Sequence, residues 1–171
     1  MDNATEVLKE INWDKELTNT EFPTNMKFEG DNITKAISLA ERSIKGGDIQ
    51  PDIYENFDSK QKIIFMMELE DKGAKQEVLE RVDSALKVTG KEKNPDILLY
   101  WLTLNIPSRL DKVKKDVEEY LKGYGRAKYI TPVYTLLAGA NTTFAKEQFD
   151  KNKANYNPRV VKSLEKIILK N

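Results

Sequence analysis

The spacing of apolar residues after residue 30 is the feature that most constrains the fold of this chain. Apolar side chains recur every three or four positions, the period that gathers them on one face of an α-helix. The first such stripe consists of Ile33, Ile37, Ala40 and Ile44. No segment keeps up the alternation of apolar and polar residues that is typical of a strand. The pattern therefore predicts an all-α protein.

Proline, glycine and capping residues divide the stripes into separate helices. Asp31 or Asn32 and Asp58 or Ser59 can cap helices, and Asn94-Pro95 reads as a cap followed by a first helical residue. Further helices are predicted to start at Pro107, Thr131-Pro132, Thr142 or Thr143, and Pro158. Predicted stops lie at Gly46-Gly47, Gly73, Gly90, Gly123 and Gly139. These signals give about seven to nine helices.

The connections between the predicted helices are short, so successive helices are expected to pack antiparallel, either as a bundle or as stacked pairs in an α-solenoid. No sequence repeat is visible, and periodicity alone leaves this choice open. Residues 1–30 are predicted to be an irregular lead-in strap in which Trp13 is an anchor. Residues 31–171 are predicted to be a single helical domain.

Charge and hydropathy narrow the classes of partner. The chain has 171 residues with 28 basic and 28 acidic side chains, so its formal net charge is zero. A nucleic-acid-binding protein normally shows an excess of basic residues, so we expect this chain to bind no nucleic acid. No apolar run approaches the roughly 20 residues that cross a bilayer. The segment Met1–Glu6 is not a signal peptide. We expect a cytoplasmic location, with a signal peptide on a longer parent protein left open.

The chain contains no histidine and no cysteine. Ser-His-Asp and Cys-His catalysis are therefore impossible with these residues alone. Catalytic zinc almost always takes at least one histidine, and no group of acids stands out as a substitute. We assign no catalytic residue and no metal site to this chain.

The stretch Gly123–Tyr129 carries Arg126 and Lys128 between two predicted helices. Its two glycines, Gly123 and Gly125, are expected to permit positive φ and a sharp turn. One interpretation is that both cations only offset the dipole of a neighbouring helix end, which contributes about 0.3–1 kcal/mol. The other is that they hold one anion, most naturally a carboxylate. Composition alone favours the first interpretation.

A family resemblance shifts that balance. Gly125-Arg126-Ala127-Lys128-Tyr129, followed by Pro132, resembles the Gly-Arg-x-Lys-Phe-x-x-Pro signature in the C-terminal domain of leukotriene A4 hydrolase-type zinc aminopeptidases. Other segments resemble that domain in the same order, over residues 11–169: Ile11-Asn12-Trp13-Asp14, Phe57–Gln61, Ile63–Met66, Asn94–Ile97 with Trp101-Leu102, Thr143-Phe144, Lys153 and Tyr156–Pro158. The chain departs from the family pattern at Thr131, Tyr129 and Asn157, where the family has arginine, phenylalanine and histidine.

The resemblance implies a two-layer α-α superhelix of the armadillo or HEAT kind. It also implies that zinc and its His-Glu-x-x-His motif lie in a separate catalytic domain of the same polypeptide, with no cofactor in this chain. Arg126 and Lys128 would bind the carboxylate of a short peptide, or of a lipid acid in some members. We interpret the chain as an expressed fragment that cannot catalyse peptide hydrolysis alone. The alternative is a stand-alone helical-repeat module that binds a partner protein.

Overall fold

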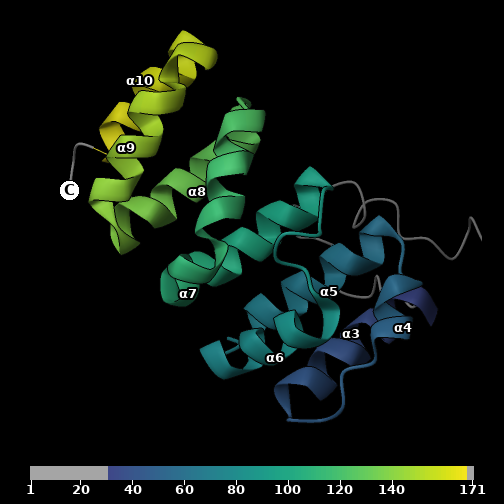
Figure 1. Cartoon of the computed structure of the whole chain (residues 1–171). Coiled ribbons are helices and arrows are strands. Elements are labelled where there is room, and N and C mark those ends of the chain that lie inside the picture. Colours follow the sequence, from purple (N-terminus) through teal and green to yellow (C-terminus); the bar gives the residue numbers. More distant parts are fainter. Residues whose placement is uncertain (1–30, 169–171) are drawn as a thin grey trace, which may run out of the picture. The chain divides into compact units, whose positions relative to one another are not determined.

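The computed structural model describes residues 31–168, which form eight α-helices and one short 3-10 helix without any strand (Figure 1). The helices are α3 (Asp31–Ile44), α4 (Pro51–Glu55), α5 (Ser59–Asp71), α6 (Gln76–Leu86), α7 (Pro95–Gly123), α8 (Ala127–Ala140), α9 (Thr142–Asn152), η1 (Lys153–Asn155) and α10 (Pro158–Ile168). The all-α prediction and the expected number of helices are confirmed. The predictions for residues 1–30, including Trp13 and the segment Ile11–Asp14, lie outside the described residues.

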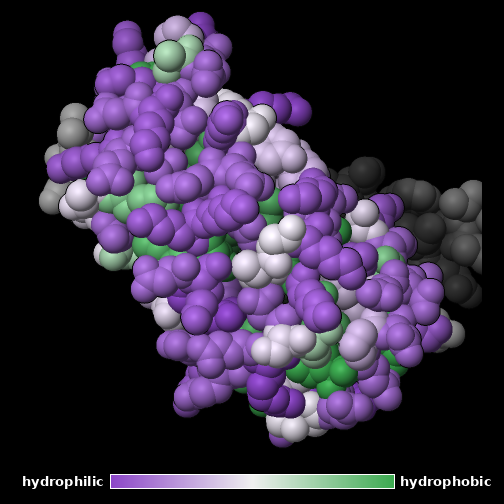
Figure 2. All heavy atoms as spheres, in the orientation of Figure 1, coloured by the Kyte–Doolittle hydropathy of each residue, from purple (hydrophilic) through white to green (hydrophobic). Residues whose placement is uncertain are grey.

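The helices stack in chain order. Helix α3 packs on α5, α5 on α7, α7 on α8, and α8 on both α9 and α10. Each helix thus contacts near neighbours in the chain, as in an α-solenoid. One apolar core runs through these contacts, and its largest fully buried side chains include Phe65, Leu69, Trp101, Leu102, Tyr120, Leu121, Tyr134 and Leu137. Figure 2 shows hydrophilic side chains over most of one face, with hydrophobic ones in the gaps between them.

Local hydrogen bonds fix the predicted helix starts. Asp58 Oδ1 accepts from the backbone N–H of Gln61 at 2.8 Å, and Gln61 Oε1 accepts from the N–H of Asp58 at 3.1 Å. This reciprocal pair is a capping box, and it starts α5. Asn94 Oδ1 accepts from the N–H of Asp96 at 3.0 Å and starts α7, with Pro95 as the first helical residue. Both predicted starts are confirmed.

The predicted break in the helical pattern near Pro107 is present, but it lies two residues later. Helix α7 consists of two helical segments that meet in a kink at Arg109, whose φ of −135° and ψ of 30° are not helical. Proline lacks the N–H that would bond to the carbonyl of Thr103, which weakens the helix at this point. The apolar stripe continues on both sides, and its burial keeps the two halves in one element.

The predicted bounds of α8 are also wrong. The helix begins at Ala127 rather than at Thr131, so Pro132 lies inside it, and it continues past Gly139 to Ala140. The next helix, α9, is capped by Asn141 Oδ1, which accepts from the N–H of Phe144 at 2.9 Å. The predicted caps were Thr142 and Thr143. Asparagine and threonine can both supply a capping oxygen, so the sequence did not show which of the three residues caps α9. The earlier start of α8 matters most, since it places Lys128 within the helix.

Candidate functional site

The connection between α7 and α8 is short and extended. Gly123 is the last residue of α7, Tyr124 has φ −123° and ψ 132°, and Arg126 has φ −79° and ψ 136°. Among the described glycines, positive φ occurs only at Gly46, Gly73 and Gly90, so the expected positive φ at Gly123 and Gly125 is wrong. What distinguishes Gly125 is close packing. A Cβ there would lie 3.3 Å from Cδ1 of Tyr156 and 3.4 Å from the backbone oxygen of Asn155.

Tyr156 supports the turn from the C-terminal part of the chain. Its ring lies against Gly125, and its hydroxyl donates to the backbone oxygen of Leu121 at 2.6 Å. The same hydroxyl lies 3.3 Å from that of Tyr134. Burial raises the pKa of Tyr156, so the phenol stays protonated and able to donate. Tyr156 belongs to a segment that carried the family resemblance, and this contact gives that segment a physical role.

Three tyrosines pack around the turn, and sequence reasoning did not single them out as a group. The ring centroids of Tyr120 and Tyr124 lie 4.8 Å apart, those of Tyr124 and Tyr129 5.7 Å, and those of Tyr120 and Tyr129 6.4 Å. The Tyr120 hydroxyl donates to the backbone oxygen of Pro95 at 3.2 Å. This tyrosine cluster joins both ends of α7 to the start of α8. Its signal in the sequence was the gathering of tyrosines around one pair of glycines.

The two candidate cations lie at the start of α8 and are both exposed. Arg126 is the N-cap residue, and its side chain has no hydrogen-bond or ion-pair partner among residues 31–168. Lys128 is paired, since its Nζ lies 2.7 Å from Oδ1 of Asp96 in the first turn of α7. Its Nζ also lies 5.0 Å from the ring centroid of Tyr129. The hydrogen bond to Asp96 is the main cause that raises the pKa of Lys128, and the charge of Arg126 opposes it.

The start of α8 adds backbone donors to these cations. No side chain in the described part of the chain caps this 14-residue helix. The first N–H groups of a helix have no partner within it and, with the helix dipole, favour an anion. The arrangement combines one free guanidinium, one paired ammonium and uncapped N–H groups. It is suited to holding a carboxylate, and it offers no acid–base or nucleophilic group of its own.

The described residues do not fit a zinc site. Over residues 31–168 no group of three His, Cys, Asp or Glu side chains is placed to hold a metal ion. The full sequence has neither histidine nor cysteine. No helix within the same range is long and apolar enough to cross a membrane.

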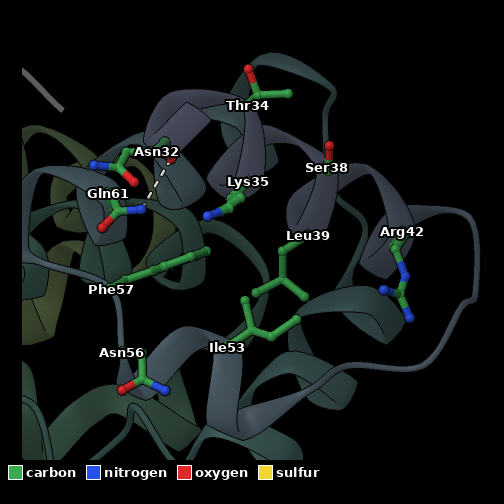
Figure 3. Close-up of a pocket in the computed structure, with 10 residues that line it drawn as sticks. All are labelled: Asn32, Thr34, Lys35, Ser38, Leu39, Arg42, Ile53, Asn56, Phe57 and Gln61. Atoms are coloured by element: carbon green, nitrogen blue, oxygen red, sulfur yellow. Dashed lines mark hydrogen bonds between the residues drawn. The ribbon is translucent and has the colours of Figure 1, made fainter. Parts of the chain in front are cut away.

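A second candidate is a hollow between α3, α4 and α5 (Figure 3). It is a cavity of about 500 Å³, with Lys35 and Arg42 among its polar lining residues. Its apolar lining comes from Leu39, Ile53 and Phe57. A cavity of this size is in the range of small-molecule sites, so its polar groups decide whether it is a candidate.

Three of those polar side chains, Gln61, Arg42 and Asn56, are engaged in holding the fold. Gln61 Nε2 donates to the backbone oxygen of Asn32 at 3.0 Å, the bond that Figure 3 marks. Arg42 Nη2 donates to the backbone oxygen of Asp48 at 3.3 Å, and Asn56 Nδ2 donates to a backbone oxygen of its own helix. Because these side chains serve local structure, the turn before α8 is the better candidate.

A match to a known protein family covers the candidate site. The family model "Leukotriene A4 hydrolase, C-terminal" matches residues 57–168, which includes the turn, Asp96 and Tyr156. The chain belongs to the leukotriene A4 hydrolase C-terminal family. The resemblance stated from the sequence is thereby confirmed. Of the segments that carried it, those from Phe57 onward lie in the matched range.

Relatives of this leukotriene A4 hydrolase C-terminal domain are longer proteins. This chain is 26% identical over 167 residues to leucine aminopeptidase 2 of Yarrowia lipolytica, and the match covers 91% of this chain and 26% of the relative. It is 27% identical over 166 residues to leucine aminopeptidase 2 of Candida albicans, covering 90% of this chain and 27% of the relative. The chain thus spans about a quarter of the length of the curated relatives it matches.

Solved structures show the same fold. Native leukotriene A4 hydrolase from Saccharomyces cerevisiae matches with a TM-score of 0.82 at 18% identity, over 95% of this chain and 30% of that one. A second structure, of the native yeast enzyme, matches with a TM-score of 0.83 at 18% identity, over 98% and 30%. At this identity the likeness speaks for the fold alone. It confirms the predicted helical architecture of the leukotriene A4 hydrolase C-terminal domain.

Proposed function

We propose that this domain binds the C-terminal carboxylate of a short peptide through Arg126 and Lys128, and so positions the peptide in a zinc aminopeptidase. One observation carries the proposal. Arg126, exposed at an uncapped helix start, has no partner among the described residues and stands beside a second cation. The relatives named leucine aminopeptidase 2 give the reaction class.

Positioning is a sufficient role for such a site. A guanidinium can hold a carboxylate with two parallel, charge-assisted hydrogen bonds, which fixes direction as well as distance. A peptide held at its C-terminus has its N-terminal bond at a set distance along the chain. Holding a reactant in a productive geometry lowers the entropic part of the activation barrier.

The chemical step belongs to another part of the polypeptide in this proposal. Zinc, when bound there, would supply the Lewis acid and activated water of a metallopeptidase. The described residues offer no group of three ligands for it, and we assign them no step in that chemistry. This domain would contribute one wall of the peptide site and would pack on the catalytic domain.

The test compares free-acid and amidated tripeptides in the polypeptide that joins this domain to the catalytic one. Replacing Arg126 by glutamine should raise KM for Ala-Ala-Ala by about tenfold, because one charge-assisted contact is lost. It should leave KM for the C-terminal amide nearly unchanged. Arg159→Gln is the matched control, since Arg159 is also exposed in the first turn of a helix. Equal losses on acid and amide would contradict the carboxylate role.

A further inference from the structure

Asp96 faces the candidate site from a different helix. Its carboxylate lies in the first turn of α7, and its Oδ1 is 2.7 Å from Nζ of Lys128. The two residues are 32 positions apart in sequence, so tertiary packing brings them together. The contact joins the starts of two helices that pack against each other.

The placement of Asp96 does not depend on Lys128. Its backbone N–H donates to the capping Asn94, and the neighbouring Pro95 accepts from the buried Tyr120. A carboxylate in the first turn of a helix is also favoured by the helix dipole. Contacts within α7 therefore hold Asp96 in place, and Lys128 is the more mobile partner because its side chain is long and exposed.

The pair changes the charge that a ligand meets. Arg126 and Lys128 alone would present two positive charges, and Asp96 reduces the sum to one. A ligand carboxylate must share the Lys128 ammonium with Asp96 or displace it. Arg126 has no such competitor within residues 31–168. A second negative charge on a ligand that approaches Lys128 would also meet the Asp96 carboxylate, which lies 2.7 Å from the Lys128 ammonium.

We propose that Asp96 is a specificity-determining residue of this site, which occupies Lys128, leaves Arg126 as the main carboxylate contact and disfavours ligands with a second negative charge. The inference rests on the proposed function, because it needs a carboxylate at the turn. Repulsion built into a site is a common means of discrimination between ligands. The favoured ligand class is a peptide whose last residue is not acidic.

The experiment titrates the chain with Ala-Ala-Ala, its C-terminal amide and Ala-Ala-Asp, and follows binding by NMR. Asp96→Asn should tighten binding of Ala-Ala-Ala by about threefold, since the competitor for Lys128 loses its charge. It should tighten Ala-Ala-Asp by about tenfold, because a like charge is also removed. Asp52→Asn is the matched control, as it removes an exposed first-turn aspartate from another helix. It should change neither affinity.

A double-mutant cycle gives a readout that altered folding would not imitate. In the wild-type background, Arg126→Gln should weaken the binding of Ala-Ala-Ala more than Lys128→Gln does. With Asp96→Asn the two losses should become similar, because Lys128 is then free for the ligand. The Lys128 pKa, followed through its side-chain NMR signal without ligand, should fall in Asp96→Asn, since the hydrogen-bonded carboxylate raises it.

The outcomes separate this inference from the proposed function. An unchanged Lys128 pKa in Asp96→Asn would overturn the inference, because the ion pair would not exist in solution. A wild-type preference for the free acid with no effect of Asp96→Asn would overturn the inference alone. Equal binding of the free acid and the amide by the wild-type chain would overturn the proposed function and this inference together.

Discussion

The bend inside α7 and the turn that follows α7 each present an arginine, and the two arginines are in opposite settings. The Arg109 side chain is only 5% exposed, and its Nη2 lies 3.3 Å from Oδ2 of Asp83. Its Nη1 donates to Oδ1 of Asn105, one turn earlier in the same helix. Arg126 is exposed and has no partner in the described part of the chain.

The difference shows how burial decides what a charge can do. A guanidinium taken out of water needs acceptors. Nη2 of Arg109 joins α7 to α6 through Asp83, and Nη1 bonds within α7. Asp83 also accepts from the hydroxyl of Thr89 at 2.7 Å, and that hydroxyl accepts from Nε1 of the buried Trp101 at 3.0 Å. The guanidinium of Arg109 therefore serves the fold. That of Arg126 contributes little to the fold and remains available for a ligand.

The largest expected effect follows from removing the buried arginine. Arg109→Ala should lower the free energy of unfolding by about 3 kcal/mol, because Asp83 loses its buried ionic partner. Urea unfolding followed by tryptophan fluorescence measures this. Arg126→Ala is the matched control and should change stability by less than about 0.5 kcal/mol. Similar losses in the two variants would erase the contrast between the two arginines.

A smaller effect is expected at the support of the turn. Gly125→Ala should lower the free energy of unfolding by about 1 kcal/mol, because its Cβ would press on the buried ring of Tyr156, which cannot move freely. Gly139→Ala is the control of opposite sign. Gly139 lies in α8 with nothing within 4 Å of its Cβ position, so alanine should stabilise the helix. Thermal unfolding of both variants tests this, and a stabilised Gly125→Ala would contradict the close contact.

The smallest effect is expected at Asp116, a buried acid that has no arginine partner of the kind that Asp83 has in Arg109. Asp116 accepts from the backbone N–H of Gly90 at 2.8 Å, and its burial raises the pKa of its carboxyl. An acid with a raised pKa stabilises the fold while protonated and loses that contribution as pH rises above the ordinary aspartate range. Asp116→Asn should therefore stabilise the chain by about 0.5 kcal/mol near neutral pH, and less in acid. A gain that stays constant with pH would count against this cause.

Local patterns predicted much of the fold because they act over a few residues. Apolar stripes gave the helices, and the capping oxygens of Asp58 and Asn94 fixed two starts correctly. Proline was the weak guide. Pro107 read as a helix start, and the break between the two segments of α7 lies two residues later, at Arg109. Pro132 also read as a helix start, yet it lies inside α8.

The candidate site was predictable only in part. Arg126 and Lys128 are two positions apart in sequence, so their nearness to each other followed from the pattern. The partner of Lys128 lies 32 residues away and the support of Gly125 comes from Tyr156, and no local rule reports either contact. A closely packed glycine has the same one-letter code as a glycine required for positive φ. The structure was needed to tell them apart.

The contact between Gly125 and Tyr156 also makes the length of the intervening chain a property of the site. The chain between Gly125 and Tyr156 runs through α8 and α9 and comes back to the turn. An insertion or deletion in this segment would move the tyrosine relative to the glycine and would change the direction in which Arg126 points. Changes in length between α8 and α10 are therefore expected to be poorly tolerated.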